Sequence, residues 1–132
     1  MERKGLIKGY LRKAEEKLKA ADIELGQGLY DEAVSAAYYA MFHASKAILL
    51  TKDISPRTHH GVIVQTAKEF MDSLERESLE SLSWGLERRI KVDYDVLYDA
   101  DKAEAEDAIN RAEAFIKDIK EALKDLKVAF EK

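Results

Sequence analysis

The stretch Tyr30–Leu50, YDEAVSAAYYAMFHASKAILL, decides the fold of this chain. After Glu32 its only charged side chain is Lys46. Small residues and large apolar residues recur at helical spacing along two lines: Ala33, Ala37, Ala40, Ala44 and Ala47, then Val34, Tyr38, Met41 and Ile48. A helix that is apolar on most of its sides lies at the centre of a bundle. We therefore expect the remaining helices to pack around this one.

A third line along the same helix is polar and consists of Ser35, Tyr39, His43 and Lys46. A fully buried helix would not need these side chains, since buried polar groups require partners. We expect the edge from Tyr39 to His43 to face a neighbour or a ligand.

Hydrophobic periodicity predicts four further helices, and no strand pattern competes with them. Their expected ranges are Glu2–Gln27, Ser55–Met71, Leu74–Val92 and Lys102 to the end of the chain. With 132 residues, one proline and six glycines, the chain predicts a single all-α domain over residues 1–132. Short links favour an antiparallel up-and-down bundle of four to five helices.

Three helix starts are predicted from capping residues. Ser55 followed by Pro56 places a good N-cap before a proline at the first helical position. Asp72 and Asp101 are each followed three residues later by a glutamate, which is capping-box spacing. In the helix after Asp72, the predicted inner side consists of Leu79, Leu82, Leu86 and Ile90.

Composition excludes several classes of function. The chain has no cysteine, so disulfides and thiolate nucleophiles are excluded, and a net charge of −4 argues against a generic phosphate-binding surface. The sequence contains no Gly-rich phosphate loop, no HExxH motif and no CxxC motif. It therefore predicts neither a cofactor nor a metal. The longest run without a charged side chain, Ala33–Ser45, is too short to span a bilayer. We expect a cytoplasmic protein without membrane association.

The histidines supply the first candidate sites. His43 lies on the polar line, where a hydrogen-bonded, half-buried role competes with a role in a site. Arg57, Thr58, His59 and His60 gather at a predicted helix N-terminus, which favours anions, although capping and packing would explain them equally well. Adjacent histidines point about 100° apart on a helix, so we expect no metal site there.

A second candidate cluster is Arg88, Arg89, Asp93 and Tyr94. Arg89 and Asp93 are four residues apart, so on a continuous helix they would lie on one side and could pair. One interpretation is a structural ion pair with Tyr94 packed beneath it. The other is an arginine that donates to a phosphate.

Together these pieces resemble the HEPN domain family of small helical prokaryotic proteins. The segments that carry the resemblance are Gly28–Ala33 (GLYDEA), Ala37–Ala44 (AYYAMFHA), Lys46–Leu50, Thr58–Val62 (THHGV) and Arg89–Tyr94 (RIKVDY). The resemblance implies a bundle of four or five helices that is often a two-fold dimer. It also implies, for many members, a minimal nucleotidyltransferase partner in a toxin–antitoxin pair. In such pairs the HEPN protein is often a metal-independent ribonuclease that uses an Arg, a His four to six residues later, and a Tyr just beyond.

This chain departs from that pattern at one position. Arg89 and Tyr94 fit the ends of the motif, but Asp93 stands about where the histidine belongs, and no histidine has an arginine at the required distance before it. RNA cleavage needs a base for the 2′-hydroxyl and an acid for the leaving oxygen. An aspartate repels phosphate and is not a cationic donor at pH 7. His59 could substitute if the fold brings it beside Arg89.

Three hypotheses follow. The leading one is a non-catalytic or weakly active HEPN protein that forms a homodimer and binds a nucleotidyltransferase partner, a nucleotide or RNA. Its ligand candidates are Arg57, Thr58, His59, His60, Tyr39, His43 and Arg88. The second is a metal-independent endoribonuclease toxin that uses Arg89, Asp93 or His59, and Tyr94. The third is a purely structural interaction module.

Overall fold

The structure is a computed structural model that describes residues 2–130 and is all-helical over that range, as predicted. The helices are α1 (Arg3–Gly26), α2 (Tyr30–Leu49), α3 (His59–Phe70), α4 (Arg76–Tyr94) and α5 (Lys102–Phe130), and a 3₁₀ turn, η1 (Leu50–Lys52), follows α2. None of these helices combines the length and the apolar character that crossing a membrane requires.

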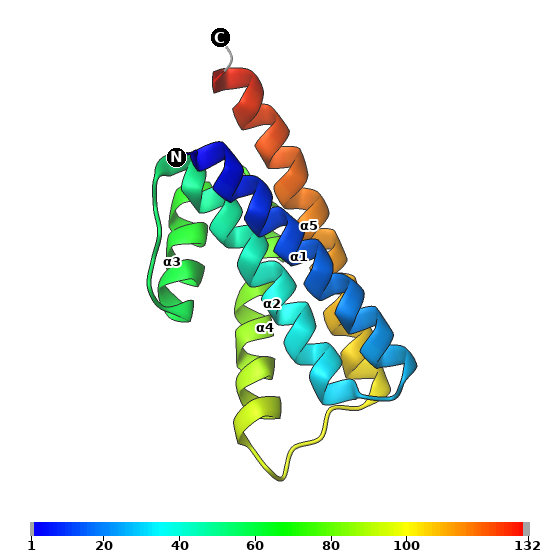
Figure 1. Ribbon diagram of the computed structural model, residues 1–132. Helices are drawn as coiled ribbons and strands as arrows, with labels where there is room; N and C mark the ends of the chain where they lie inside the picture. The colour runs from blue at the N-terminus through cyan, green and yellow to red at the C-terminus, as the bar shows by residue number, and fades with distance from the viewer. Residues whose placement is uncertain (1, 131–132) are drawn as a thin grey trace.

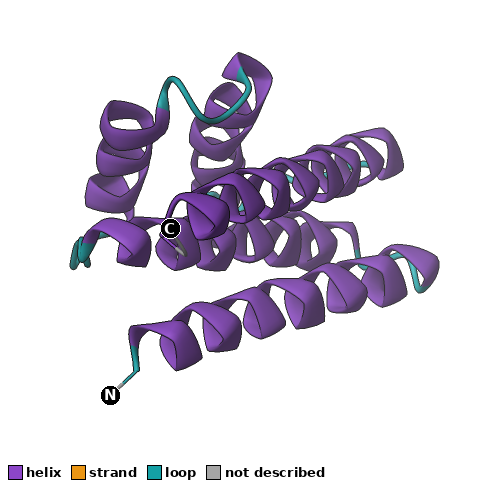
Figure 2. Ribbon diagram, turned by 90° about the horizontal axis from the view of Figure 1, so that it is seen from above, coloured by secondary structure: helices purple, strands orange, loops and turns teal. Residues whose placement is uncertain are grey.

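The long helices α1, α2 and α5 lie side by side, and α3 and α4 form a shorter pair at an angle to them (Figures 1 and 2). Along the chain α1, α2, α4 and α5 alternate in direction, which is the expected up-and-down order (Figure 1). The segment 53–58 runs back along the bundle, so α3 rises in the same direction as α2 (Figure 1). The fold is therefore a four-helix bundle with one additional helix.

Helix α2 is the centre of the bundle and packs against each of the other four helices. Every member of its small line and of its large line is buried, which confirms the prediction from its two stripes. The small side chains let α1 and α5 approach closely, while Tyr38 and Met41 fill the space toward α4. Among the residues whose burial is described, α2 contributes more buried apolar side chains than any other helix.

Helix α4 contacts α2 at Gly85, and the predicted inner stripe is confirmed at Leu82 but wrong at Ile90. The buried residues of α4 are Ser78, Ser81, Leu82 and Gly85. Leu79 and Leu86 are half-buried, and Ile90 is 46% exposed. A Cβ placed on Gly85 would lie 2.7 Å from Met41 Cε and 3.2 Å from Tyr38 Cδ1, so large residues cannot occupy this contact.

We expect Gly85→Ala to destabilise the protein by about 1–2 kcal/mol, because the steric cost of an added methyl group exceeds the gain in helix propensity. Gly9→Ala is the matched control, since Gly9 is also helical and a Cβ there meets nothing within 4 Å. That change should stabilise the protein by about 0.5–1 kcal/mol. Urea denaturation followed by circular dichroism measures the free energy of unfolding of both variants. If both were destabilised, or both stabilised, the tight α2–α4 contact would be contradicted.

Two predicted helix starts were also wrong. Helix α3 begins at His59 rather than near Pro56, and its N-cap is Thr58, whose Oγ1 accepts a hydrogen bond of 2.8 Å from Gly61 N. Ser55 and Thr58 offer the same capping chemistry, but segment 53–58 is extended along the bundle and delays the start. Helix α4 begins at Arg76 rather than after Asp72.

The start of α4 is set by a tertiary contact rather than by a local cap. The backbone N–H of Glu75 donates to Asp118 Oδ2 on α5 at 2.7 Å. By contrast, the predicted start of α5 is confirmed, because Asp101 Oδ1 accepts from the backbone N–H of Glu104 at 2.8 Å. The link before it is tied to α2 by Asp31 Oδ1, which accepts from Ala100 N at 2.8 Å.

Candidate functional site

Arg89, near the end of α4, is the centre of a cluster that joins α2, α3 and α4. Its Nη2 donates a hydrogen bond of 2.8 Å to the Tyr39 hydroxyl, and its Nε lies 3.0 Å from Asp93 Oδ2. The guanidinium carbon lies 5.4 Å from the Tyr39 ring centroid and 5.6 Å from that of Tyr94. The predicted Arg89–Asp93 pair is thus confirmed, and the arginine side chain is only 16% exposed.

His59 belongs to the same cluster, although it is far from Arg89 in the sequence. Its Nδ1 lies 2.7 Å from the hydroxyl of Tyr38, which is buried on α2. Its ring stacks on Phe42 at 4.4 Å between centroids and meets the Tyr39 ring edge-on at 5.8 Å. Tyr39 therefore contacts His59 with its ring and Arg89 with its hydroxyl. We call Tyr38, Tyr39, His59, Arg89, Asp93 and Tyr94 the Arg89 cluster.

The protons in this cluster are assigned by its hydrogen bonds. Burial raises the pKa of Tyr38, with a further contribution from Tyr39 and opposition from Arg89, so the hydroxyl stays protonated. This buried hydroxyl has no other partner within residues 2–130, so it donates to His59 Nδ1. Burial and then the charges of Arg89 and Lys46 lower the pKa of His59. A lowered pKa favours the neutral ring, and with Nδ1 as the acceptor we assign the ring proton to Nε2.

His43 lies one turn beyond Tyr39 on α2 and is surrounded by cations. Its ring stacks on Tyr10 of α1 at 6.1 Å, and its Nδ1 is buried without a hydrogen-bond partner in the described part of the chain. Burial, followed by the charges of Lys13, Lys17 and Lys46, lowers the pKa of His43 to about 4. The Tyr39–His43 edge is half-buried, with His43 facing Tyr10 of α1 while Tyr39 contacts His59 of α3 and Arg89 of α4.

The depressed pKa of His43 predicts a loss of stability in mild acid. The unfolded chain binds a proton near the ordinary pKa of 6.5 and the folded chain only near 4, so stability falls as the pH drops through that window. The expected loss is on the order of 2 kcal/mol, allowing for partial exposure.

Urea denaturation at pH 7 and pH 4.5 measures this loss, and His43→Gln should reduce it. His60→Gln is the matched control, because His60 is exposed at the start of α3. A wild-type and a His43→Gln protein with the same pH dependence would contradict the assignment.

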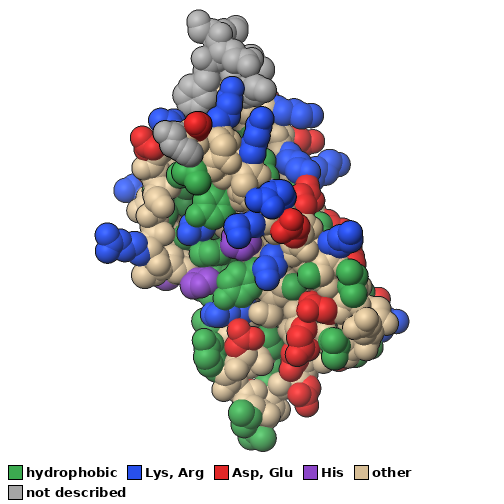
Figure 3. Space-filling view, in the orientation of Figure 1, with side chains coloured by type: hydrophobic (Ala, Val, Ile, Leu, Met, Phe, Trp, Pro, Cys, Tyr) green, Lys and Arg blue, Asp and Glu red, His purple; other side chains and the backbone are tan. Residues whose placement is uncertain are grey.

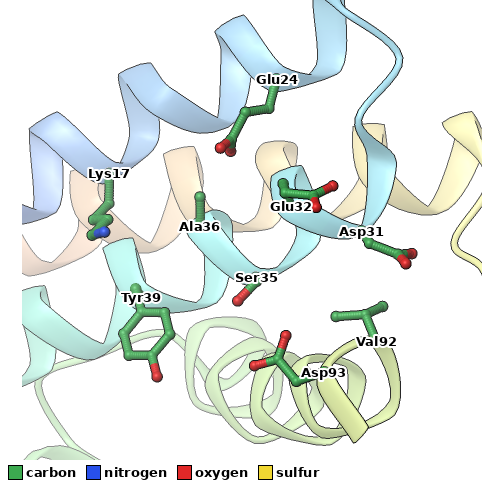
Figure 4. A pocket seen from close by; sticks show the side chains of 9 residues that line it. All are labelled: Lys17, Glu24, Asp31, Glu32, Ser35, Ala36, Tyr39, Val92 and Asp93. Carbon is green, nitrogen blue, oxygen red and sulfur yellow. The ribbon is translucent and has the colours of Figure 1, made fainter. Parts of the chain in front are cut away.

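An acidic pocket of about 340 Å³ adjoins the cluster between α1, α2 and α4 (Figure 4). Its polar lining includes Glu24, Asp31, Glu32 and Asp93, and its only cationic side chain is Lys17. Burial and the charge of Glu32 raise the pKa of Glu24, while Lys17 opposes them. This pocket repels phosphate, so a bound anion would lie on the other side of Tyr39, toward His43.

The other predicted residues lie apart from the cluster. Arg88 points toward α5, where its Nη1 lies 3.4 Å from the Tyr98 hydroxyl and 4.0 Å from Glu104 Oε2. Arg57 and His60 are exposed at the start of α3, and the Thr58 hydroxyl is occupied by the cap. Within residues 2–130, no group of three or more His, Asp or Glu side chains is placed to hold a metal ion.

Sequence reasoning did not identify Tyr38, Lys13 or Lys17 as site residues. Tyr38 lies in the large apolar line of α2, so the sequence predicts a core residue, and the side chain is indeed buried. Its hydroxyl is the signal that could have found it, since a buried tyrosine needs a partner for that group. The lysines of α1 read as a solvated helix face.

Comparison with known proteins gives the family. The family model described as "HEPN domain" matches residues 7–126. The chain is 37% identical over 115 residues to "Putative toxin MJ0142" of Methanocaldococcus jannaschii, covering 86% of this chain and 78% of that protein. It is 38% identical over 122 residues to "Putative toxin MJ0605" of the same organism, covering 91% of this chain and 90% of that protein.

A solved structure agrees with the fold. The crystal structure of TT1696 from Thermus thermophilus matches with a TM-score of 0.76 and covers 88% of this chain and 97% of that one. At 22% sequence identity this likeness supports the helical architecture alone. The family model, the curated relatives and the architecture agree, and we conclude that the chain belongs to the HEPN domain family.

Proposed function

We propose that this HEPN protein is non-catalytic or only weakly active and works by binding RNA or a nucleotide at the Arg89 cluster. One observation carries the proposal. His59 Nδ1 is engaged by the Tyr38 hydroxyl, and Asp93 is held in an ion pair with Arg89. Activation of a 2′-hydroxyl needs a free base within hydrogen-bond reach, and here each of the two candidate bases already has a partner.

The donors of the cluster, in contrast, are available for an anion. Of the Arg89 nitrogens, only Nη2 makes a hydrogen bond within the described residues 2–130, and Nε is buried beside Asp93, so Nη1 is the nitrogen left for an anion. The neutral His59 ring presents Nε2–H as a second donor, and Tyr94 is 70% exposed. An arginine with unused donors beside aromatic rings suits a phosphate with an attached base.

The proposal also includes assembly, as the family resemblance implies. A second copy of the chain and a minimal nucleotidyltransferase are the proposed partners. At the end of α4 and in the link after it, Ile90, Tyr94, Val96 and Leu97 are exposed large hydrophobic side chains, with Val96 and Leu97 more than 90% exposed. Exposed apolar residues gathered in this way support a protein contact at this end of α4.

We expect Asp93→Asn to raise the affinity for a labelled oligoribonucleotide by about fivefold, because it removes a negative charge beside the bound phosphate and releases Arg89. Fluorescence anisotropy in EDTA measures the affinity, and gel electrophoresis of the same samples measures cleavage. Glu80→Gln is the matched control, since Glu80 pairs with Arg76 on the same helix at the same spacing and is exposed. Metal-independent cleavage that Asp93→Asn abolishes would refute the proposal.

The second candidate is a metal-independent endoribonuclease toxin. Two relatives carry names that include "toxin", and His59 reaches the Arg89 cluster as an acid or base would need to. For this function the Tyr38–His59 bond would have to open so that Nδ1 becomes free. This candidate predicts cleavage in EDTA that is lost in both Arg89→Ala and His59→Gln. Binding without cleavage contradicts it.

A further inference from the structure

Two lines of side chains face each other where α1 and α2 run antiparallel. Spacings of three and four residues keep each line on one side of its helix. The α1 line is Tyr10, Lys13 and Lys17, and the α2 line is Tyr39, His43 and Lys46. We call these six residues, with the adjoining Phe42, the lysine strip.

Contacts tie the two lines together. The Tyr10 ring stacks on His43. Lys46 Nζ lies 5.3 Å from the Tyr10 ring centroid and 5.4 Å from that of Phe42. Lys17 Nζ lies 5.9 Å from the ring centroid of Tyr39. The strip therefore alternates cations with aromatic rings and ends at Tyr39, where the Arg89 cluster begins.

The lysines of the strip lack carboxylate partners. Within the described residues, Lys13, Lys17 and Lys46 form no ion pair, whereas neighbouring cations such as Arg12 and Lys120 pair with Glu16 and Glu15. Lys and Arg side chains gather with histidine and apolar side chains in the middle of this face (Figure 3). A chain with a net charge of −4 thus carries a local positive surface.

The aromatic rings give the strip more than charge. A lysine over an exposed ring is held weakly, so an arriving phosphate can draw Nζ away and uncover the ring for stacking. Tyr10 and Phe42 are half-buried, so part of each side chain stays accessible. A positive groove interleaved with aromatic side chains is the pattern by which proteins hold single strands.

We propose that the lysine strip binds a single-stranded nucleic acid, with phosphates on Lys13, Lys17 and Lys46 and bases against Tyr10 and Phe42. This inference rests on the proposed function, because the strand would reach the Arg89 cluster at Tyr39. It extends that function to a second surface on α1 and α2. A duplex does not fit, since its bases are stacked on one another and cannot reach the rings.

The acidic pocket limits where the strand can run. Beyond Tyr39 the acidic pocket is lined by Glu24, Asp31 and Glu32, which repel phosphate. Lys17 and Tyr39 belong to both this pocket and the strip. The surface charge therefore changes from positive to negative within one or two turns of helix. The strand is therefore confined to the lysine strip and to Arg89.

The test compares two triple variants of equal charge in the full-length chain. The first is Lys13→Gln, Lys17→Gln, Lys46→Gln, and the control is Lys102→Gln, Lys117→Gln, Lys124→Gln, three exposed lysines of α5. The probes are labelled oligouridylate and oligothymidylate of about twelve nucleotides, and a duplex of the same length. Anisotropy in EDTA over a range of KCl concentrations measures affinity and its salt dependence, and circular dichroism verifies folding.

We expect the strip variant to lose at least about tenfold in affinity for both single strands, with a salt slope smaller by about 2, since each phosphate contact contributes about 0.7. The control should bind as the wild type does. Tyr10→Ala should weaken binding by about fivefold or more without changing the slope.

Three outcomes would overturn the inference: equal losses in both triple variants, equal affinity for the duplex, or no binding of any oligonucleotide. Arg89→Ala separates the two proposals. If it abolishes binding while the strip variant binds normally, the strip proposal fails and the proposed function stands. If only the strip variant loses binding, the strip stands and the proposed role of the Arg89 cluster fails.

Discussion

Arg89→Ala is expected to lower the affinity of the protein for a single-stranded oligoribonucleotide by about a hundredfold. The guanidinium offers several donors in a fixed fork, and a charge-assisted contact with a phosphate in a partly desolvated site contributes on the order of 2–3 kcal/mol. Removing it also leaves Asp93 without its cation, so the site gains an unpaired negative charge. Anisotropy in EDTA measures the loss.

The chain contains a closely matched control for this experiment. Arg76 lies on the same helix and pairs with Glu80 at the same four-residue spacing, but its side chain is 87% exposed. Arg76→Ala should change the affinity by less than about twofold, because exposed pairs contribute little and no ring lies beside them. Equal losses in Arg76→Ala and Arg89→Ala would show that net charge alone attracts RNA, and would contradict a site at Arg89.

Tyr38→Ala is expected to cost about 3–5 kcal/mol of folding free energy, the largest effect on stability that we predict. The ring is fully buried between α2 and α4 and lies against Gly85, so its removal leaves a cavity at the centre of the bundle. A cost of that size is a large fraction of the stability of a typical domain. Urea denaturation with a linear extrapolation measures it.

Two companion variants separate the ring of Tyr38 from its hydroxyl. Tyr38→Phe keeps the packing but removes the donor to His59 Nδ1, and should cost about 1–2 kcal/mol. Tyr94→Ala removes a 70% exposed tyrosine and should cost about 0.5 kcal/mol or less. A Tyr38→Phe protein as stable as the wild type, with an unchanged His59 imidazole in nitrogen NMR, would contradict the assigned hydrogen bond.

The sequence predicted what depends on local periodicity. The two lines of α2 are buried as expected, and the Arg89–Asp93 pair forms because four residues make one helical turn. The Asp101 cap was predicted for the same reason. The start of α3 was missed because Ser55 and Thr58 are equivalent capping residues, and the path of segment 53–58 along the bundle chooses between them.

Which residues come together in the candidate site depends on contacts between segments that are far apart in the sequence, and helical periodicity does not predict such contacts. Whether His59 meets Arg89 is decided by the reversal of the chain between η1 and α3. The predicted inner side of α4 was right for Leu82 but omitted Gly85, which meets Tyr38 and Met41, and wrongly included Ile90, which is exposed. In both cases the neighbour that determines the outcome lies many residues away in the sequence.

The position of α3 outside the alternating order of the other helices has a consequence for motion. Its main contacts are with α2 and α4 alone, and only Val62, Thr66 and Phe70 are buried within it. A short helix with so few buried side chains can open locally while the four-helix body remains folded. His59 would leave with it, and Arg89 would remain with Tyr39 and Asp93. The Arg89 cluster therefore joins the stable four-helix body to the less stable helix α3. A ligand that contacts both Arg89 and His59 would hold α3 in place.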